Sequence, residues 1–337
     1  MLVAVAVAIA FLGVPALAGV PARLVEGCGD WIVTAGVLEV LSIAGFVVIF
    51  KLVFAAPVGW RGSISAGLRA LAATTLLPAG GVIGPTMGAW SASEKRPSLA
   101  QLARATVVFV ILTSAPAAFA LAALGTLLWL GVLGGPRDAA LTLLPAALAA
   151  AVIAATWLAA RSSHRTALAH PPHGDRATPR PRPRHRARSA LHARGALAKV
   201  CQPLRDGLTD ALELVGAGDW KLAGALAYSA FDLAVLWAAF HAYGHTPPLG
   251  VIGMGYLVGS LAGALPLPAG LGVVDGGLIG ALALYGAPVV PAAAAVLLYR
   301  GISLSLPIAL GAVGWMSCPA GRSRAVGRRH GLASVKS

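Results

Sequence analysis

The sequence predicts an all-α fold, a polytopic transmembrane helical bundle with two broken or re-entrant helical hairpins in an inverted repeat. Three observations predict it. The 337 residues are 58% hydrophobic and 11% charged, with a mean hydropathy of +0.80, whereas a soluble domain is about 45–50% apolar and 25% charged. The apolar residues form runs long enough to cross a bilayer. Two of those runs are interrupted by similar Pro/Gly clusters.

Six uninterrupted apolar runs predict membrane-spanning helices, because a crossing needs about 20 residues. They cover residues 1–20, 31–56, 104–132, 139–160, 219–243 and 291–316. The first run has the apolar content of a secretory signal, but no basic residue precedes it. We therefore expect a retained first helix, and a cleaved signal is the alternative.

Two further apolar stretches, 64–92 and 249–286, contain the octets LPAGGVIG and LPAGLGVV. Proline removes a helical hydrogen bond and glycine permits unusual backbone angles, so each octet should end one short helix and begin another. Interrupted backbone at membrane depth persists only inside protein or along a wet cavity. Two broken or re-entrant hairpins are expected. Two ordinary pairs of short spans, with octets alike by chance, are the alternative.

Lysine and arginine concentrate in residues 161–206 and in the tail, which places both on the cytoplasmic side of a bacterial plasma membrane. Three predicted spans then separate the two hairpins, so the hairpins enter from opposite faces and the repeat is inverted. Inverted repeats with broken helices are typical of alternating-access transporters.

The organisation predicted from this topology has four parts. Residues 1–160 form the first transmembrane half with hairpin 64–92, and residues 207–316 form the second half with hairpin 249–286. Residues 161–206 are a basic Pro/Arg-rich linker, expected to be disordered because prolines and like charges oppose folding. Residues 317–337 are a basic cytoplasmic tail. The linker sets topology or contacts anionic lipid headgroups; without interleaved aromatic residues, no nucleic acid partner is expected.

Charged residues inside predicted spans are candidates for function, because an ionisable group in hydrocarbon is costly. Arg300 lies near the middle of its span, and we expect it to pair with Asp275 or Asp232 or to contact a substrate anion. Asp275 follows the second break. We expect it to cap the half-helix that begins there, to gate against Arg300 or to couple transport to protons. Arg104 is the repeat-related counterpart of Arg300 or an interfacial anchor. Asp232 and Glu39 are expected to be buried counter-charges.

Enzymatic chemistry is not expected. The sequence has no phosphate-binding loop, nucleophile elbow or zinc-protease motif, and no cofactor is implied. His241 and His245 are one helical turn apart, but a third metal ligand is not evident. The glycines at 255, 259 and 263 form a small-residue stripe that predicts close helix packing.

The second interruption carries a family resemblance. Pro268, Gly270, Leu271 and Gly272 with Asp275, followed by Tyr299-Arg300, resemble the P-G-G-L-G-x-x-E and L-x-Y-R elements of the flippase-like membrane region of bacterial lysylphosphatidylglycerol synthases. A weaker likeness runs from Pro78 to Arg104. Here Ala269 replaces a glycine and Asp275 the usual glutamate, whose longer side chain leaves the gating geometry open. We expect no aminoacyltransferase domain and therefore no synthase activity of the kind found in full-length members. The resemblance implies movement of a lipid between leaflets.

We therefore predict a flippase-like transporter for an anionic lipid or lipid-linked headgroup. Membrane lipids, above all anionic ones, are the expected partners, and association with further copies of the chain is left open. The alternatives are a small-solute transporter or channel and a noncatalytic scaffold. A lateral apolar opening favours lipid and a closed polar vestibule favours solute. The candidate substrate-binding residues combine the charged side chains with the two breaks, where half-helix N-termini attract anions: Arg300, Asp275, Tyr299, Gly270, Gly272, Pro268, Arg104, Pro78 and Gly80.

Overall fold

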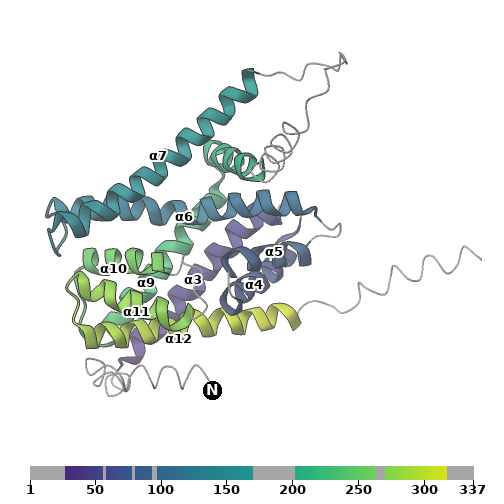
Figure 1. The fold of residues 1–337 in the computed structure, drawn as a ribbon. Coiled ribbons are helices and arrows are strands. Elements are labelled where there is room, and N and C mark those ends of the chain that lie inside the picture. Colours follow the sequence, from purple (N-terminus) through teal and green to yellow (C-terminus); the bar gives the residue numbers. More distant parts are fainter. Residues whose placement is uncertain are drawn as a thin grey trace, which may run out of the picture.

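The computed structural model describes residues 27–55, 58–77, 80–92, 97–169, 202–262 and 270–316, with the side chains of 92, 160–169, 262 and 270–274 left out. All regular structure within these ranges is helical, which confirms the all-α prediction (Figure 1).

Five described helices are long and apolar enough to cross a membrane. They are α3 (Gly29–Phe54), α6 (Leu99–Trp129), α7 (Ala139–Ala169), α9 (Ala223–Ala242, preceded by the short η2, Trp220–Leu222) and α12 (Val289–Met316). Each matches one of the predicted spans. The predicted span 1–20 lies outside the described residues. The chain is therefore a multi-pass membrane protein.

Both interrupted stretches form pairs of short helices. The first pair is α4 (Trp60–Leu76) and α5 (Gly80–Ala92), and the second is α10 (Leu249–Ala262) and α11 (Gly270–Leu284). The four helices have 13 to 17 residues, fewer than the roughly 20 that a crossing needs. The helices of each pair pack on each other. The helix starts at Gly80 and Gly270 fall where the Pro/Gly clusters predict them, and Pro78 and Pro268 lie outside the described residues.

The small-residue stripe of α10 allows the second hairpin to close tightly. A Cβ atom added at Gly255 would lie 2.6 Å from the Leu282 side chain, and one at Gly259 would lie 2.7 Å from Leu278 Cα. A side chain at Gly259 would therefore require a shift of the α11 backbone, and one at Gly255 would require the Leu282 side chain to move. The predicted role of the glycines is thus confirmed at these two positions, and Gly263 lies outside the described residues.

Helices α3 and α9 make the most extensive contact in the bundle. The contact is close because glycines face each other: a Cβ atom at Gly45 would lie 2.6 Å from Tyr228 N and 2.8 Å from Gly224 O. The Cys28 amide donates to the Ala242 carbonyl, which places the start of α3 beside the end of α9 and makes the two helices antiparallel.

The two hairpins lie toward opposite ends of α12, which runs past both (Figure 1). Near the C-terminus of α12, Gly311 and Gly314 pack against α4, while α11 packs along its other part. In the same way, α6 contacts both α5 and α10. Each of these long helices therefore touches the hairpin of the other half. An inverted repeat would produce this reciprocity, and the repeat itself stays a prediction.

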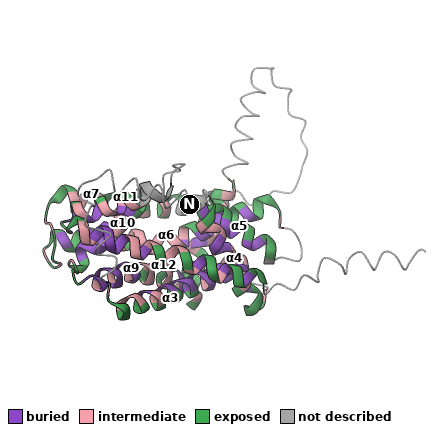
Figure 2. Ribbon diagram, turned by 90° about the horizontal axis from the view of Figure 1, so that it is seen from below, coloured by how far each residue is buried: buried purple, intermediate pink, exposed green. Residues whose placement is uncertain are grey.

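Buried residues form two clusters inside the bundle, and exposed large apolar residues cover much of its outside (Figure 2). One cluster surrounds the second hairpin with α9, and the other surrounds the first hairpin with α3. Five exposed tryptophans lie near helix ends, as expected where a protein meets the membrane–water interface: Trp60, Trp90, Trp129, Trp220 and Trp315. Exposed Trp157 lies near the end of the apolar span Ala139–Ala159 within α7.

The linker prediction needs a correction at both ends. Helix α7 continues to Ala169, and a further helix covers residues 202–217. The sequence from 161 to 169 contains no proline and ends in Ala167, Leu168 and Ala169, which favour helix, and the prolines of the linker begin only at Pro171. Residues 170–201 and the predicted tail 317–337 lie outside the described residues.

Candidate functional site

An ion pair inside the bundle joins the second hairpin to α12. Arg300 Nε lies 2.5 Å from Asp275 Oδ1, and the two side chains are 25% and 21% exposed. The two atoms do not meet hydrogen-bond geometry, however, and neither has another hydrogen-bond partner among the described residues. The predicted pairing of Arg300 thus falls on Asp275.

Asp232 of α9 lies beside this pair and is held by two phenol groups. Tyr299 donates to Asp232 Oδ2 at 3.0 Å, and Tyr256 of α10 donates to the same oxygen. The tyrosine rings meet edge to face at 6.4 Å between centroids, and the Arg300 guanidinium lies 5.6 Å from the Tyr299 ring. Asp232 also interacts electrostatically with Arg300. Helices α9, α10, α11 and α12 therefore meet in one polar cluster.

The cluster lies near the middle of the membrane-spanning helices. Arg300 is eleven residues from the start of α12 and Asp232 is nine from the start of α9, which corresponds to roughly 17 and 14 Å along the helix axes. The hydrocarbon core is about 30 Å thick. Neither charge can reach the headgroup region by extending its side chain, so the cluster must be solvated by protein groups, water or a ligand.

Glu39 of α3 adds a further carboxyl to the same level. Its side chain is 4% exposed, and its Oε2 atom has no hydrogen-bond partner among the described residues. Its electrostatic neighbours are Asp232 and the Tyr228 phenol, both on α9. The prediction that Glu39 is a counter-charge is therefore wrong in the described part of the chain, because the group beside it is a second carboxyl rather than a cation.

Four buried side-chain polar atoms in the described residues have no hydrogen-bond partner: Glu39 Oε2, Asp275 Oδ1, Arg300 Nε and Ser303 Oγ. Ser303 lies one turn after Tyr299 on α12, so three of the atoms are on helices that form the cluster, and Glu39 is on α3, which packs against α9. Buried polar groups are normally hydrogen-bonded, and exceptions need an explanation such as water or a ligand. These four atoms make the region around Arg300 the candidate functional site.

The structure separates the other predicted site residues from this cluster. Arg104 lies in the second turn of α6, where its guanidinium makes a bidentate contact with Asp210 of the helix over 202–217. Its side chain is 48% exposed, as expected of an interfacial anchor. Gly80 starts α5 in the other hairpin, whereas Gly270 and Gly272 form the first turn of α11, which carries Asp275. The structure therefore brings together Asp275, Tyr299 and Arg300, and adds Asp232.

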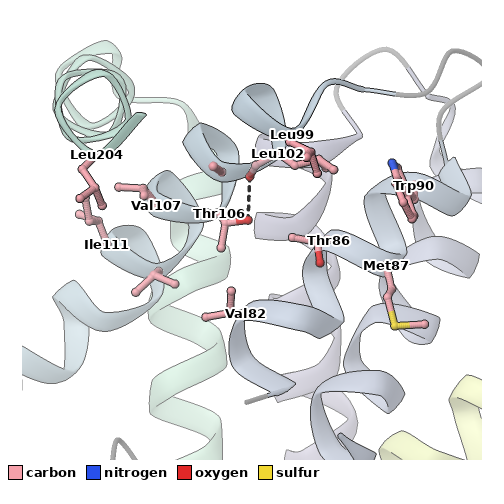
Figure 3. Close-up of a pocket in the computed structure, with 12 residues that line it drawn as sticks. Val82, Thr86, Met87, Trp90, Leu99, Leu102, Thr106, Val107, Ile111 and Leu204 are labelled. Carbon is pink, nitrogen blue, oxygen red and sulfur yellow. Dashed lines mark hydrogen bonds between the residues drawn. The ribbon is translucent and has the colours of Figure 1, made fainter. Parts of the chain in front are cut away.

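An apolar groove lies elsewhere, between α5, α6 and the helix over 202–217 (Figure 3). It has a volume of about 630 Å³ and is lined by side chains such as Met87, Trp90 and Leu204. The two threonines in it, Thr86 and Thr106, donate their hydroxyl groups to carbonyl oxygens of their own helices. The groove therefore presents hydrocarbon rather than hydrogen-bonding groups, and it shares no lining residue with the polar cluster.

The described residues contain no group of three or more His, Cys, Asp or Glu side chains placed to hold a metal ion. His241 Nδ1 is within 3.0 Å of the Trp237 carbonyl, and its ring packs against Trp31 and Trp237. His245 Nδ1 instead faces the Tyr243 carbonyl. The two histidines are thus engaged with separate backbone groups.

Sequence reasoning missed Tyr256, Tyr228 and Ser303. Each lies in a mostly apolar helix that holds at least one other hydroxyl residue, and tyrosines and serines occur in spans for many reasons. Only the placement of α10 and α12 around Asp232 makes Tyr256 part of the cluster. For Tyr256, the sequence offered one signal, a phenol in a helix made largely of Gly, Leu and Val.

Comparison with known proteins agrees with the resemblance that the site motifs carry. The family model for the lysylphosphatidylglycerol synthase TM region matches residues 1–311. No curated protein and no solved structure matches the chain. The matched region includes both hairpins and every residue of the polar cluster. The chain belongs to the lysylphosphatidylglycerol synthase transmembrane-region family.

Proposed function

We propose that this protein moves an anionic lipid or lipid-linked headgroup between the leaflets of a bacterial plasma membrane, with the linker and C-terminus on the cytoplasmic side. It acts as a transporter rather than as an enzyme. The observation that carries the proposal is the incompletely bonded polar cluster around Arg300 in the middle of the spanning helices. A mid-membrane cation with poorly directed bonds suits a phosphate, whose oxygens match the guanidinium fork.

In this proposal, the headgroup phosphate competes with Asp275 for Arg300. Asp275 belongs to the second hairpin and Arg300 to α12, so exchange of the partner loosens one contact between these two elements. Headgroup binding and hairpin movement are thereby linked, which alternating access requires. The apolar lining of the groove beside α6 supports a lipid rather than a water-soluble solute, because acyl chains require hydrocarbon contact.

The test uses the full chain reconstituted into phosphatidylcholine vesicles that contain acyl-labelled fluorescent phosphatidylglycerol. Reduction of the outer-leaflet fluorophore by dithionite reports how fast inner-leaflet lipid reaches the outside. The parent protein should raise this rate above that of protein-free vesicles, and Arg300→Gln should abolish the increase. Arg300→Lys should restore only part of it, because lysine lacks the planar fork.

The matched control is Arg61→Gln, which removes an exposed arginine near the start of α4. This variant should move the labelled lipid at the parent rate. Equal rates in parent and protein-free vesicles would refute the function. Equal rates in the parent and both Arg300 variants would refute the site.

A further inference from the structure

The carboxyl groups of Glu39 and Asp232 interact electrostatically between α3 and α9, the two helices with the most extensive contact in the bundle. Glu39 is almost fully buried, and its Oε2 atom lacks a hydrogen-bond partner. Asp232 by contrast accepts hydrogen bonds from two phenols. The two carboxyl groups therefore have unequal support although they are neighbours.

An ionised carboxylate that is buried without a partner is strongly disfavoured, and such a group takes up a proton instead. A second negative charge nearby disfavours ionisation further. Burial disfavours the ionised form of Asp232 as well, but phenol donors and the Arg300 charge oppose that effect at Asp232 and not at Glu39. This unequal support favours a resting state with one proton on Glu39 and one negative charge on Asp232.

Cations on the helices packed against α3 are engaged elsewhere in the described structure. Arg69 of α4 donates to the Ser65 carbonyl, Arg104 of α6 binds Asp210, and Lys221 of η2 binds Asp219. Arg61 is exposed near the start of α4. The remaining titratable groups that face the pair are Tyr228 from α9, Tyr256 from α10, and Tyr299 and Arg300 from α12.

We propose that Glu39 and Asp232 form a proton-binding pair that takes up a second proton when an anionic headgroup binds at Arg300, so that one proton and one headgroup cross together. The proposal rests on the proposed function. The phosphate brings a negative charge next to Asp232 and occupies the cation that stabilises it. Asp232 then accepts a proton from the water on the loading side and returns it on the opposite side when the headgroup leaves. No other bond is made or broken.

The first experiment asks whether Glu39 carries a proton, independently of any transport. Infrared spectroscopy of the full chain in phosphatidylcholine vesicles at neutral pH should show a carbonyl stretching band of a protonated carboxylic acid. Glu39→Gln should lose this band. Glu213→Gln, which changes an exposed glutamate of the helix over 202–217, should keep it. An unchanged band in Glu39→Gln would overturn the proposal.

The second experiment asks whether proton movement drives the lipid. In the dithionite assay, the distribution of labelled phosphatidylglycerol between leaflets is measured with and without a pH difference of one unit. One-to-one coupling shifts the ratio toward the more alkaline side by up to about tenfold, because one pH unit is a tenfold ratio of proton activity. The parent and Glu213→Gln should show the shift, Glu39→Gln should lose it, and Glu39→Asp should regain part of it.

The outcomes separate the two proposals. If the parent equilibrates the lipid but ignores the pH difference, or responds instead to a sodium gradient at constant pH, the coupling is refuted and the lipid transport stands. A pH response in Glu39→Gln equal to that of the parent also refutes it. If the parent moves no labelled lipid, the proposed function fails and the coupling fails with it.

Discussion

Substitution of Gly45 by alanine tests whether the α3–α9 contact that aligns Glu39 with Asp232 is as close as the structure indicates. The added Cβ atom would lie 2.6 Å from Tyr228 N and 2.8 Å from Gly224 O, about 0.8 and 0.6 Å short of ordinary van der Waals contact. Both opposing atoms belong to the backbone, so a side-chain rotation cannot relieve the overlap. The helices must move apart.

Gly36→Ala on the same helix is the matched control, because a Cβ atom there has no neighbour within 4 Å. Alanine favours helix over glycine by about 0.5–1 kcal/mol at either position, and this gain cancels in the comparison. What remains is the cost of overpacking, about 1–3 kcal/mol. Gly45→Ala should thus have a free energy of unfolding lower than that of Gly36→Ala by this amount.

The assay is reversible unfolding of the purified full chain in mixed micelles, with increasing fractions of a denaturing detergent, followed by helix content. A difference between the two variants below about 0.5 kcal/mol, near the additivity error of such measurements, would refute a glycine-mediated contact. A larger cost in Gly45→Ala with loss of the pH-driven lipid shift would further show that the same contact sets the geometry of the carboxyl pair.

Three further perturbations are measured by the same unfolding assay. The double variant Arg300→Gln, Asp275→Asn should be destabilised less than the sum of the two single variants, with a coupling energy of about 1–3 kcal/mol. This is below the roughly 3–5 kcal/mol that removal of one partner costs in a fully buried pair, because both side chains are partly exposed. Additive effects would contradict the ion pair. Tyr299→Phe removes a donor to Asp232 and should cost about 1.5–3 kcal/mol, an effect that should shrink in an Asp232→Asn background. Ser98→Ala removes the side chain that caps α6 and should cost about 1 kcal/mol; unchanged stability would argue against the cap.

Five of the six predicted spans and both interrupted hairpins could be predicted from the sequence because they depend on local properties. A run of about 20 apolar residues has one stable solution in a bilayer, and a Pro/Gly cluster ends a helix wherever it occurs. For the same reason the start of α11 at Gly270 agrees with prediction. The predicted linker is too long at both ends because high charge density alone does not end a helix: α7 continues to Ala169, just before the first proline of the linker at Pro171, and the next helix already begins at residue 202.

The composition of the polar cluster was decided by tertiary structure. The sequence indicates that Arg300 needs a partner, but Asp275 and Asp232 satisfy that need equally well in sequence terms, and only the packing of α11 on α12 assigns the ion pair to Asp275. Glu39 is separated from Asp232 by almost two hundred residues. The two carboxyl groups become neighbours because Gly45 and Gly224 let α3 and α9 approach backbone to backbone. Membrane insertion is set by hydrophobicity along the chain, whereas a site between helices depends on which faces meet, and that is fixed by packing.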